Sequence, residues 1–125
     1  MLCLMPTNDK ELLNSLSKNI FGCEFNGDVG FVLYKEDKAI GIAKIYCAPE
    51  ASRLISLGIL PSERKQGFGD FFTRSLLSQM SLVSSKVIIE YANGYYKKFG
   101  FVEKEGKMEI DSQNIVFPCA CKKGV

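Results

Sequence analysis

The chain contains the stretch Leu57-Gly-Ile-Leu-Pro-Ser-Glu-Arg-Lys-Gln-Gly-Phe-Gly-Asp-Phe-Phe72, in which the spacing of apolar residues changes. Residues 53–60 form a short apolar run that predicts a strand, and Gly58 inside it suggests a bulge, a close backbone contact or simple packing. From Phe68 onward, apolar residues recur every four positions as far as Met80, which is typical of a helix buried on one face. The sequence therefore predicts a strand, a glycine-containing loop and a helix from Gly67 to about Ser81.

The predicted helix start has the features of an anion site. The first N–H groups of a helix lack intrahelical partners, and the helix dipole is positive there, so a phosphate is favoured. Arg64 and Lys65 add positive charge, and glycines let a ligand approach the backbone. The alternative is a strand-to-helix turn in which glycines only relieve crowding. The loop lacks the G-x-x-x-x-G-K-[ST] motif, and Phe72 replaces the third glycine of G-x-G-x-x-G.

The rest of the chain predicts a mixed α/β or α+β domain. A helix capped by Thr7 or Asn8 follows a first strand that Pro6 stops, and a short helix covers Gly94–Phe99. The expected strands, with 53–60, are 2–5, 30–36, 39–47, 86–91, 101–110 and 114–121. Residues 1–125 are therefore interpreted as one domain.

Composition excludes several function classes. The chain of 125 residues has no histidine, which removes histidine-based nucleophile systems, metal sites and proton relays. A net charge of +2 is too balanced for a dedicated nucleic-acid or membrane-surface binder. Five cysteines without a C-x-x-C motif, including Cys119 and Cys121, indicate free thiols in a reducing cytoplasm and no metal site. The N-terminus lacks the features of a secretory signal.

Three segments resemble one family. Arg64-Lys-Gln-Gly-Phe-Gly69 is similar to the R/Q-x-x-G-x-G/A signature of the GNAT superfamily of N-acetyltransferases, and Leu57-Gly-Ile-Leu-Pro61 is similar to its strand ending L-x-V-x-P. Tyr95-Tyr-Lys-Lys-Phe-Gly-Phe101 resembles its F-Y-x-K-x-G-F segment. The segments occur in the expected order, although the loop before Tyr96 is shorter than in many members.

The resemblance implies a GNAT-like domain with a mixed, mostly antiparallel sheet of about seven strands and three to four helices. Strands 53–60 and 86–91 would splay into a V that holds acetyl-CoA, with the pyrophosphate on the helix start. Asp70 would then have to face away from the phosphates, towards Arg74. The residues implied in acetyl-CoA binding are Ile59, Leu60, Arg64, Lys65, Gln66, Gly67, Phe68, Gly69, Asp70 and Asn93, although Asn93 is more simply a helix cap.

The resemblance also implies catalytic roles. A neutral amine would attack the thioester, a backbone N–H near Ile59 or Leu60 would bind the oxyanion, and Tyr96 would protonate the departing sulfur, with Tyr95 as the competitor. Glu90 resembles the strand glutamate of members that act on protein N-termini, and partial burial would raise its pKa so that it acts as a base, directly or through water. The alternative is a strand-end glutamate facing solvent.

Other glutamates are less suitable as the base. The histone-acetylating members carry theirs where Arg53 stands here, which argues against copying their mechanism. Glu50 and Glu63, in loops, are weaker candidates.

The expected function is therefore transfer of an acetyl group from acetyl-CoA to a primary amine of a small molecule, peptide or protein. The rival expectation is a non-catalytic acyl-CoA-binding sensor of the same fold. Residues 21–30 are short and rich in turn residues, which predicts an open acceptor site that a homodimer would complete. The sequence itself shows neither the acceptor nor a dimer.

Overall fold

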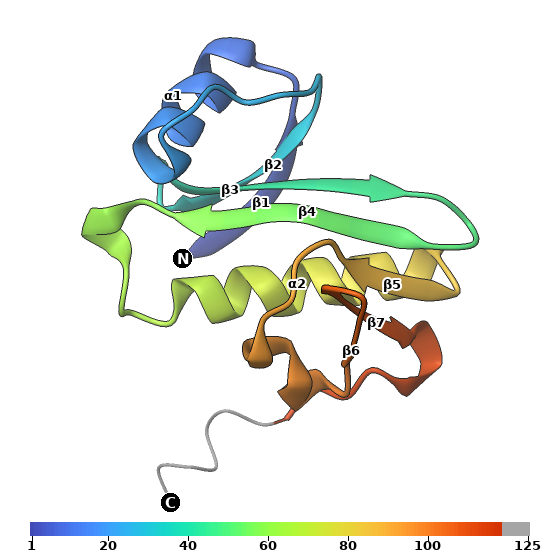
Figure 1. Ribbon diagram of the computed structural model, residues 1–125. Helices are drawn as coiled ribbons and strands as arrows, with labels where there is room; N and C mark the ends of the chain where they lie inside the picture. Colours follow the sequence, from blue (N-terminus) through green and yellow to red (C-terminus); the bar gives the residue numbers. More distant parts are fainter. Residues whose placement is uncertain (119–125) are drawn as a thin grey trace, which may run out of the picture.

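The computed structural model describes residues 1–118, which fold around one sheet (Figure 1). In chain order the elements are β1 (Leu2–Thr7), α1 (Lys10–Phe21), β2 (Gly30–Lys35), β3 (Lys38–Cys47), β4 (Ser52–Ile59), η1 (Pro61–Glu63), α2 (Phe68–Val83), β5 (Lys86–Ile89), η2 (Gly94–Phe99), β6 (Val102–Lys104), β7 (Lys107–Asp111) and η3 (Ser112–Asn114). The η elements are short 3₁₀ helices. The predicted α/β architecture is confirmed.

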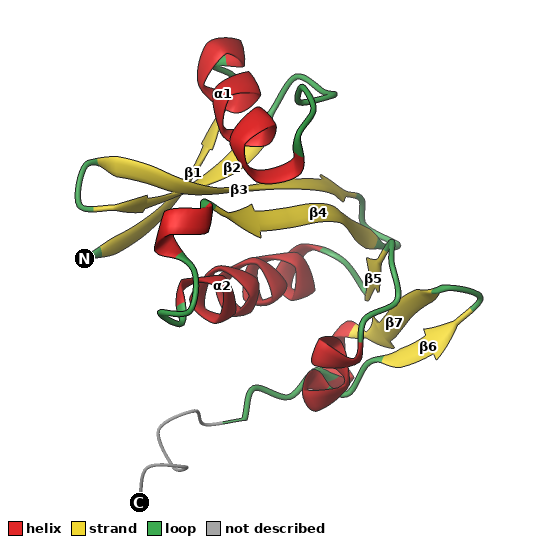
Figure 2. Ribbon diagram, turned by 60° about the vertical axis from the view of Figure 1, so that its left-hand side comes forward, coloured by secondary structure: helices red, strands yellow, loops and turns green. Residues whose placement is uncertain are grey.

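The strands of the described residues form a seven-stranded sheet in the order β1-β2-β3-β4-β5-β7-β6. All neighbours are antiparallel except β4 and β5, which are parallel. The α2 helix connects these two strands, as a parallel connection requires. Figures 1 and 2 show α1 and α2 on opposite faces of the sheet.

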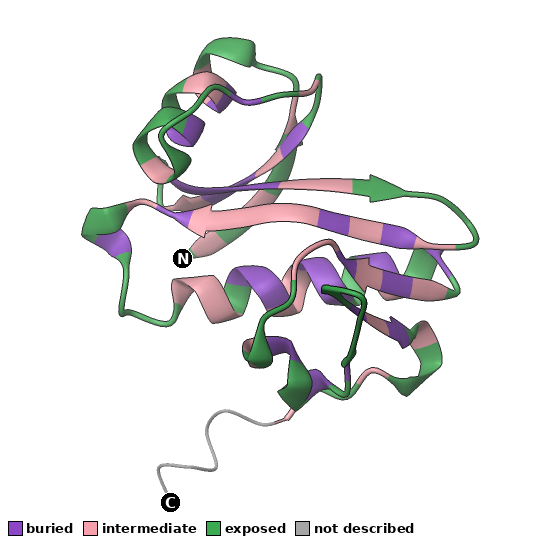
Figure 3. Cartoon of the chain, viewed as in Figure 1, coloured by how far each residue is buried: buried purple, intermediate pink, exposed green. Residues whose placement is uncertain are grey.

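Two apolar cores hold the helices on the sheet. Leu13 and Leu16 of α1 pack with Val32 and Ile42 on one face. On the other face, the predicted stripe of α2 is buried against residues of β3, β4 and β5, and Figure 3 shows buried and exposed segments alternating along α2. The main buried α2 side chains in that core are Phe72, Leu76, Leu77 and Met80.

The end of the first strand and the start of the first helix differ from expectation in detail. Strand β1 continues through Pro6 to Thr7, because β1 is a sheet edge and proline needs no N–H partner on its outer side. The cap of α1 is Asp9, whose side chain accepts the Leu12 N–H at 3.2 Å, so the predicted cap at Thr7 or Asn8 is wrong.

The end of the chain also corrects the prediction. The final antiparallel pair is the β6–β7 hairpin, which lies almost entirely inside the region predicted as one strand over 101–110. Residues 114–118 are not a strand, and the predicted strand's remaining residues, with Cys119 and Cys121, lie outside the described residues. Strand β6 is short and exposed throughout, so it lacks the apolar alternation that would have marked it.

Candidate acyl-CoA site at the V

The β4 and β5 strands separate as predicted. They pair only over Ser52–Leu54 and Val87–Ile89, and the last hydrogen bond runs from the Glu90 N–H to the Leu54 carbonyl at 2.9 Å. Strand β4 continues to Ile59, whereas β5 ends at Ile89. Residues 55–59 therefore form an open edge inside the sheet, which is one arm of the V.

The backbone groups of Ile59 and Leu60 face different directions. The Leu60 N–H donates to the Ile40 carbonyl of β3 at 2.8 Å, so it does not face the V. The Ile59 carbonyl instead accepts from Arg64 Nε at 2.9 Å. Because the N–H and C=O of a strand residue point to the same side, the Ile59 N–H also faces away from β3. Of the two predicted oxyanion donors, the geometry favours Ile59.

The irregularity of β4 is at Ile55, not at Gly58. The β3–β4 register shifts between Lys44 and Ile45, which leaves Ile55 as the extra residue. A Cβ on Gly58 would lie 2.4 Å from Ile20 Cγ2 and 3.0 Å from the Phe21 ring. Gly58 is thus required for close packing of α1 on β4, which was the alternative interpretation.

The N-terminus of α2 is shaped as an exposed backbone cradle. Gly67 has φ 83° and Lys65 has φ 66°, so the loop turns through two left-handed residues. The first helical bond runs from the Phe71 N–H to the Gly67 carbonyl at 3.1 Å, which leaves the N–H groups of residues 68–70 without an intrahelical partner. A Cβ on Gly67 would meet nothing within 4 Å, so this glycine does not relieve crowding.

Three side chains around the α2 N-terminus hold the Asp70 carboxylate. Arg74 Nε lies 2.7 Å from one carboxylate oxygen, as the spacing predicted, and Lys98 Nζ lies 3.0 Å from the other, which also accepts the Tyr95 hydroxyl. Burial alone would raise the pKa of Asp70, but the hydrogen bonds from Tyr95, Lys98 and Arg74 outweigh it and lower the pKa to about 2. Asp70 is therefore ionised but compensated.

Glu63 holds the loop between β4 and α2 to the β2–β3 hairpin. Its buried carboxylate pairs with Lys38 at 3.1 Å and Lys35 at 3.3 Å, and these bonds lower its pKa. Lys35 Nζ also lies 5.3 Å from the centre of the Phe68 ring, at the start of α2. Glu63 is thus a structural anchor. Glu50 lies in the exposed turn before β4, at the opposite end of that strand from the open edge.

Three tyrosines cluster below the V, on the α2 side of the sheet. Tyr96 is 3% exposed, and its hydroxyl lies 2.6 Å from that of half-buried Tyr91. Tyr95 packs edge-to-face on Tyr96, with ring centres 5.2 Å apart, but points its hydroxyl to Asp70. Burial raises the pKa values of both Tyr95 and Tyr96, so both stay protonated at neutral pH.

Sequence reasoning did not single out Tyr91. Its signal was its place two residues beyond the end of β5, adjacent to Glu90 and five residues before Tyr96. The Asn93 side chain accepts the Tyr95 N–H at 2.9 Å, so its capping role is confirmed.

Glu90 lies on the other side of the sheet. Val87 and Ile89 are buried in the α2-side core, so the alternating strand pattern places Ile88 and Glu90 on the opposite face. Hydrogen bonds from Lys107, at 2.8 Å, and from Arg53 lower the pKa of Glu90. The expected rise in the Glu90 pKa is wrong, because cations from β4 and β7 outweigh partial burial.

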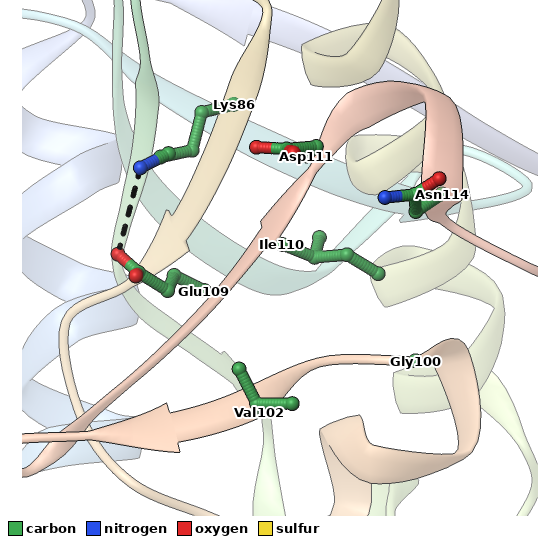
Figure 4. Close-up of a pocket in the computed structure, with 7 residues that line it drawn as sticks. All are labelled: Lys86, Gly100, Val102, Glu109, Ile110, Asp111 and Asn114. Atoms are coloured by element: carbon green, nitrogen blue, oxygen red, sulfur yellow. Dashed lines mark ion pairs between the residues drawn. The ribbon is translucent and has the colours of Figure 1, made fainter.

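A separate pocket of about 310 Å³ lies between β5, β6 and β7 (Figure 4). In this pocket Lys86 faces Glu109 at 4.0 Å, beside Val102 and Ile110. Strand β5 stands between this pocket and β4, so the pocket is not part of the V.

Comparison with solved structures identifies the fold. The chain is 15% identical to the ribosomal-protein-S18-alanine N-acetyltransferase of Escherichia coli, with a TM-score of 0.72 over 96% of this chain and 97% of that one. It is 13% identical to a GNAT family acetyltransferase of Brucella melitensis solved in complex with acetyl-CoA, with a TM-score of 0.70 over 89% and 88%. No protein-family model matches the chain, and no curated protein matches it in sequence. The chain thus has the GNAT fold, as its motifs indicated.

None of the helices in residues 1–118 is both long and apolar enough to span a membrane. In the same residues, no three acidic, cysteine or histidine side chains gather as a metal-binding group.

Proposed function

We propose that this chain, which has the GNAT fold, transfers an acetyl group from acetyl-CoA to a primary amine. The observation that supports this proposal best is the continuity of two backbone features. The open β4 edge over residues 55–59 leads, through the Arg64 loop, to the unpaired N–H groups at the start of α2. A pantetheine arm can pair with an open strand edge such as that of β4. A pyrophosphate can bind unpaired N–H groups such as those at the start of α2.

Acetyl-CoA would bind mainly to backbone groups of this segment. Ile59 would hydrogen-bond the pantetheine arm beside Leu60, and the N–H groups of residues 65–70 would bind the pyrophosphate. Arg64 and Lys65 would supply positive charge, with Gln66, Gly67, Phe68 and Gly69 forming the cradle. Asp70 fits this site because Arg74, Lys98 and Tyr95 already compensate its charge.

The chemistry would occur beside the open β4 edge of the V. The amine attacks the thioester carbonyl, and the Ile59 N–H stabilises the tetrahedral oxyanion. Tyr96 then protonates the sulfur as the C–S bond breaks. Burial keeps this phenol neutral, so its hydroxyl can donate a hydrogen bond to the sulfur at every physiological pH.

Glu90 would bind the acceptor amine from the opposite face of the sheet. Its lowered pKa makes it a weak base, but an ionised carboxylate accepts hydrogen bonds from the amine or from its water. We therefore propose that Glu90 orients the amine and passes its proton to solvent water.

The second candidate is a CoA-binding module without turnover. The observation that favours it is the pairing of both proposed catalytic groups within the protein: Tyr96 with Tyr91, and Glu90 with Arg53 and Lys107.

Thiol release from acetyl-CoA, measured with a panel of primary amines, separates the two candidates. The transferase releases CoA only when a suitable amine is present, and Tyr96→Phe slows release by roughly 100-fold or more. If acetyl-CoA raises the melting temperature but no amine supports release, the chain is a binding module. A full-rate Tyr96→Phe variant would remove Tyr96 from the acid role.

A further inference from the structure

Two phenols meet beside the V, and the proposed mechanism uses only one of them. The Tyr91 and Tyr96 hydroxyl oxygens are 2.6 Å apart, and the rings pack edge-to-face with centres 5.9 Å apart. Tyr96 is 3% exposed, whereas Tyr91 is half-buried. Tyr91 is therefore the less buried phenol of the pair.

Tyr96 alone would be a poor acid towards a departing thiolate. An alkyl thiol has a pKa of about 8.5 in water and a phenol about 10, so the proton transfer is already unfavourable for an exposed phenol. Burial of Tyr96 makes it less favourable, because the product is a phenolate inside an apolar core. The neighbouring Tyr95 hydroxyl gives no help, since it donates to Asp70.

We propose that Tyr91 and Tyr96 form a two-phenol proton relay in which Tyr91 is a second catalytic donor. This inference rests on the proposed acetyl transfer. As the C–S bond breaks, its electron pair stays on sulfur and Tyr96 gives its proton to that sulfur. Tyr91 gives its own proton to the Tyr96 oxygen, and the Tyr91 phenolate then takes a proton from water. The proton that the amine releases to solvent balances the one that Tyr91 takes up.

The direction of the relay follows from the surroundings of the two hydroxyls. Burial raises the pKa of both hydroxyls, but Tyr91 is only half-buried, whereas Tyr96 is almost completely buried. Negative charge is therefore more stable on Tyr91, the phenol nearer to solvent. A proton moves along the pair from Tyr91 to Tyr96 because the charge ends where water can solvate it.

The test uses the full chain under single-turnover conditions, with enzyme saturated by acetyl-CoA and mixed rapidly with an accepted amine. Tyr91→Phe should lower the acetyl-transfer rate about tenfold or more, while the Kd for CoA stays within about twofold of wild type. In mixtures of H₂O and D₂O, the wild-type rate should curve with deuterium content because two protons move, and the Tyr91→Phe rate should be linear. Tyr34→Phe, which removes a phenol hydroxyl from β2, is the matched control and should match wild type in both measurements.

A wild-type rate in Tyr91→Phe overturns the relay and leaves acetyl transfer standing. A slow variant that keeps the curved deuterium dependence also overturns it, because the loss is then structural. Fluorotyrosine at position 91, which keeps ring and hydroxyl, should restore a near-wild-type rate in folded protein. If wild type itself turns over no amine, the proposed function fails and the relay fails with it.

Discussion

Asp70 stabilises the fold, while its negative charge would oppose the phosphates of the proposed ligand. Its pKa of about 2 lies below the ordinary 3.8, so its stabilising contribution is present above pH 4 and is lost as the pH falls towards 2. The shift corresponds to at most about 2 kcal/mol, since water screens a side chain that is 29% exposed. The same carboxylate occupies Arg74 and Lys98, which would otherwise attract phosphate.

We predict that Asp70→Asn has opposite effects on stability and affinity. Urea unfolding at pH 7 should show a loss of up to about 2 kcal/mol, and at pH 2 the variant and wild type should be nearly equal. Calorimetry at pH 7 should show CoA binding that is several-fold tighter. Asp37→Asn, in the exposed β2–β3 turn, is the control. An equal stability loss at both pH values would contradict this explanation.

Glu90 leads to a prediction about pH dependence. Its lowered pKa keeps it ionised from pH 5 upward, so the acid limb of kcat/KM should follow the pKa of the acceptor amine. Glu90→Gln should lower kcat/KM by less than roughly 100-fold without moving that limb. Profiles with two amines of different pKa provide the measurement, and Glu103→Gln on exposed β6 is the control. A limb that disappears in Glu90→Gln would instead identify Glu90 as the base.

Among the elements, the contact between α1 and β4 depends most on one glycine. A methyl group at Gly58 meets the branched Ile20 side chain and the Phe21 ring, so either α1 or β4 must shift. Gly58→Ala should lower the free energy of unfolding by about 1–3 kcal/mol, measured by urea titration. Gly94→Ala is the matched control, because its Cβ would meet nothing within 4 Å and its φ is not positive, so its stability should change little. Equal stabilities would show that the helix adapts without cost.

Elements with a strong local pattern could be predicted from the sequence. The strand–loop–helix over 52–83 could be recognised because the apolar residues change from a continuous run to a four-residue spacing. Pro61, Gly67 and Gly69 mark the loop between the two patterns. The β6–β7 hairpin was not, since β6 has no buried side chain. The pKa of Glu90 was also out of reach, because Arg53 and Lys107 come from β4 and β7 and meet it only after the sheet forms.

On the scale of the whole molecule, the sheet divides the proposed reaction into two sides. The α2 helix and the tyrosine cluster lie on one face, whereas Arg53 and Glu90 lie on the α1 face. The acetyl group would be passed from one side to the other beside the open β4 edge.

This division predicts that the affinity for the acceptor and the affinity for CoA can be altered independently. Arg53→Gln should raise the KM for the amine acceptor and leave the Kd for CoA within twofold, because Arg53 contacts only the acceptor side of the V through Glu90. Arg64→Gln should weaken CoA binding about tenfold, the effect of losing one charged hydrogen bond, with little change in acceptor KM. Steady-state kinetics and calorimetry on the two variants check this. Variants that alter both constants together would contradict a two-sided site.

The open edge of β4 has a consequence for how the ligand-free chain survives. Most proteins confine unpaired strand edges to the margins of a sheet and protect them there, because a bare edge recruits foreign strands. Here the bare edge over residues 55–59 lies in the middle of the sheet, where β5 turns away. A bound pantetheine arm would plug that slot as a missing strand would. If CoA binds as proposed, we expect it to lower the tendency of this edge to pair with strands of other molecules.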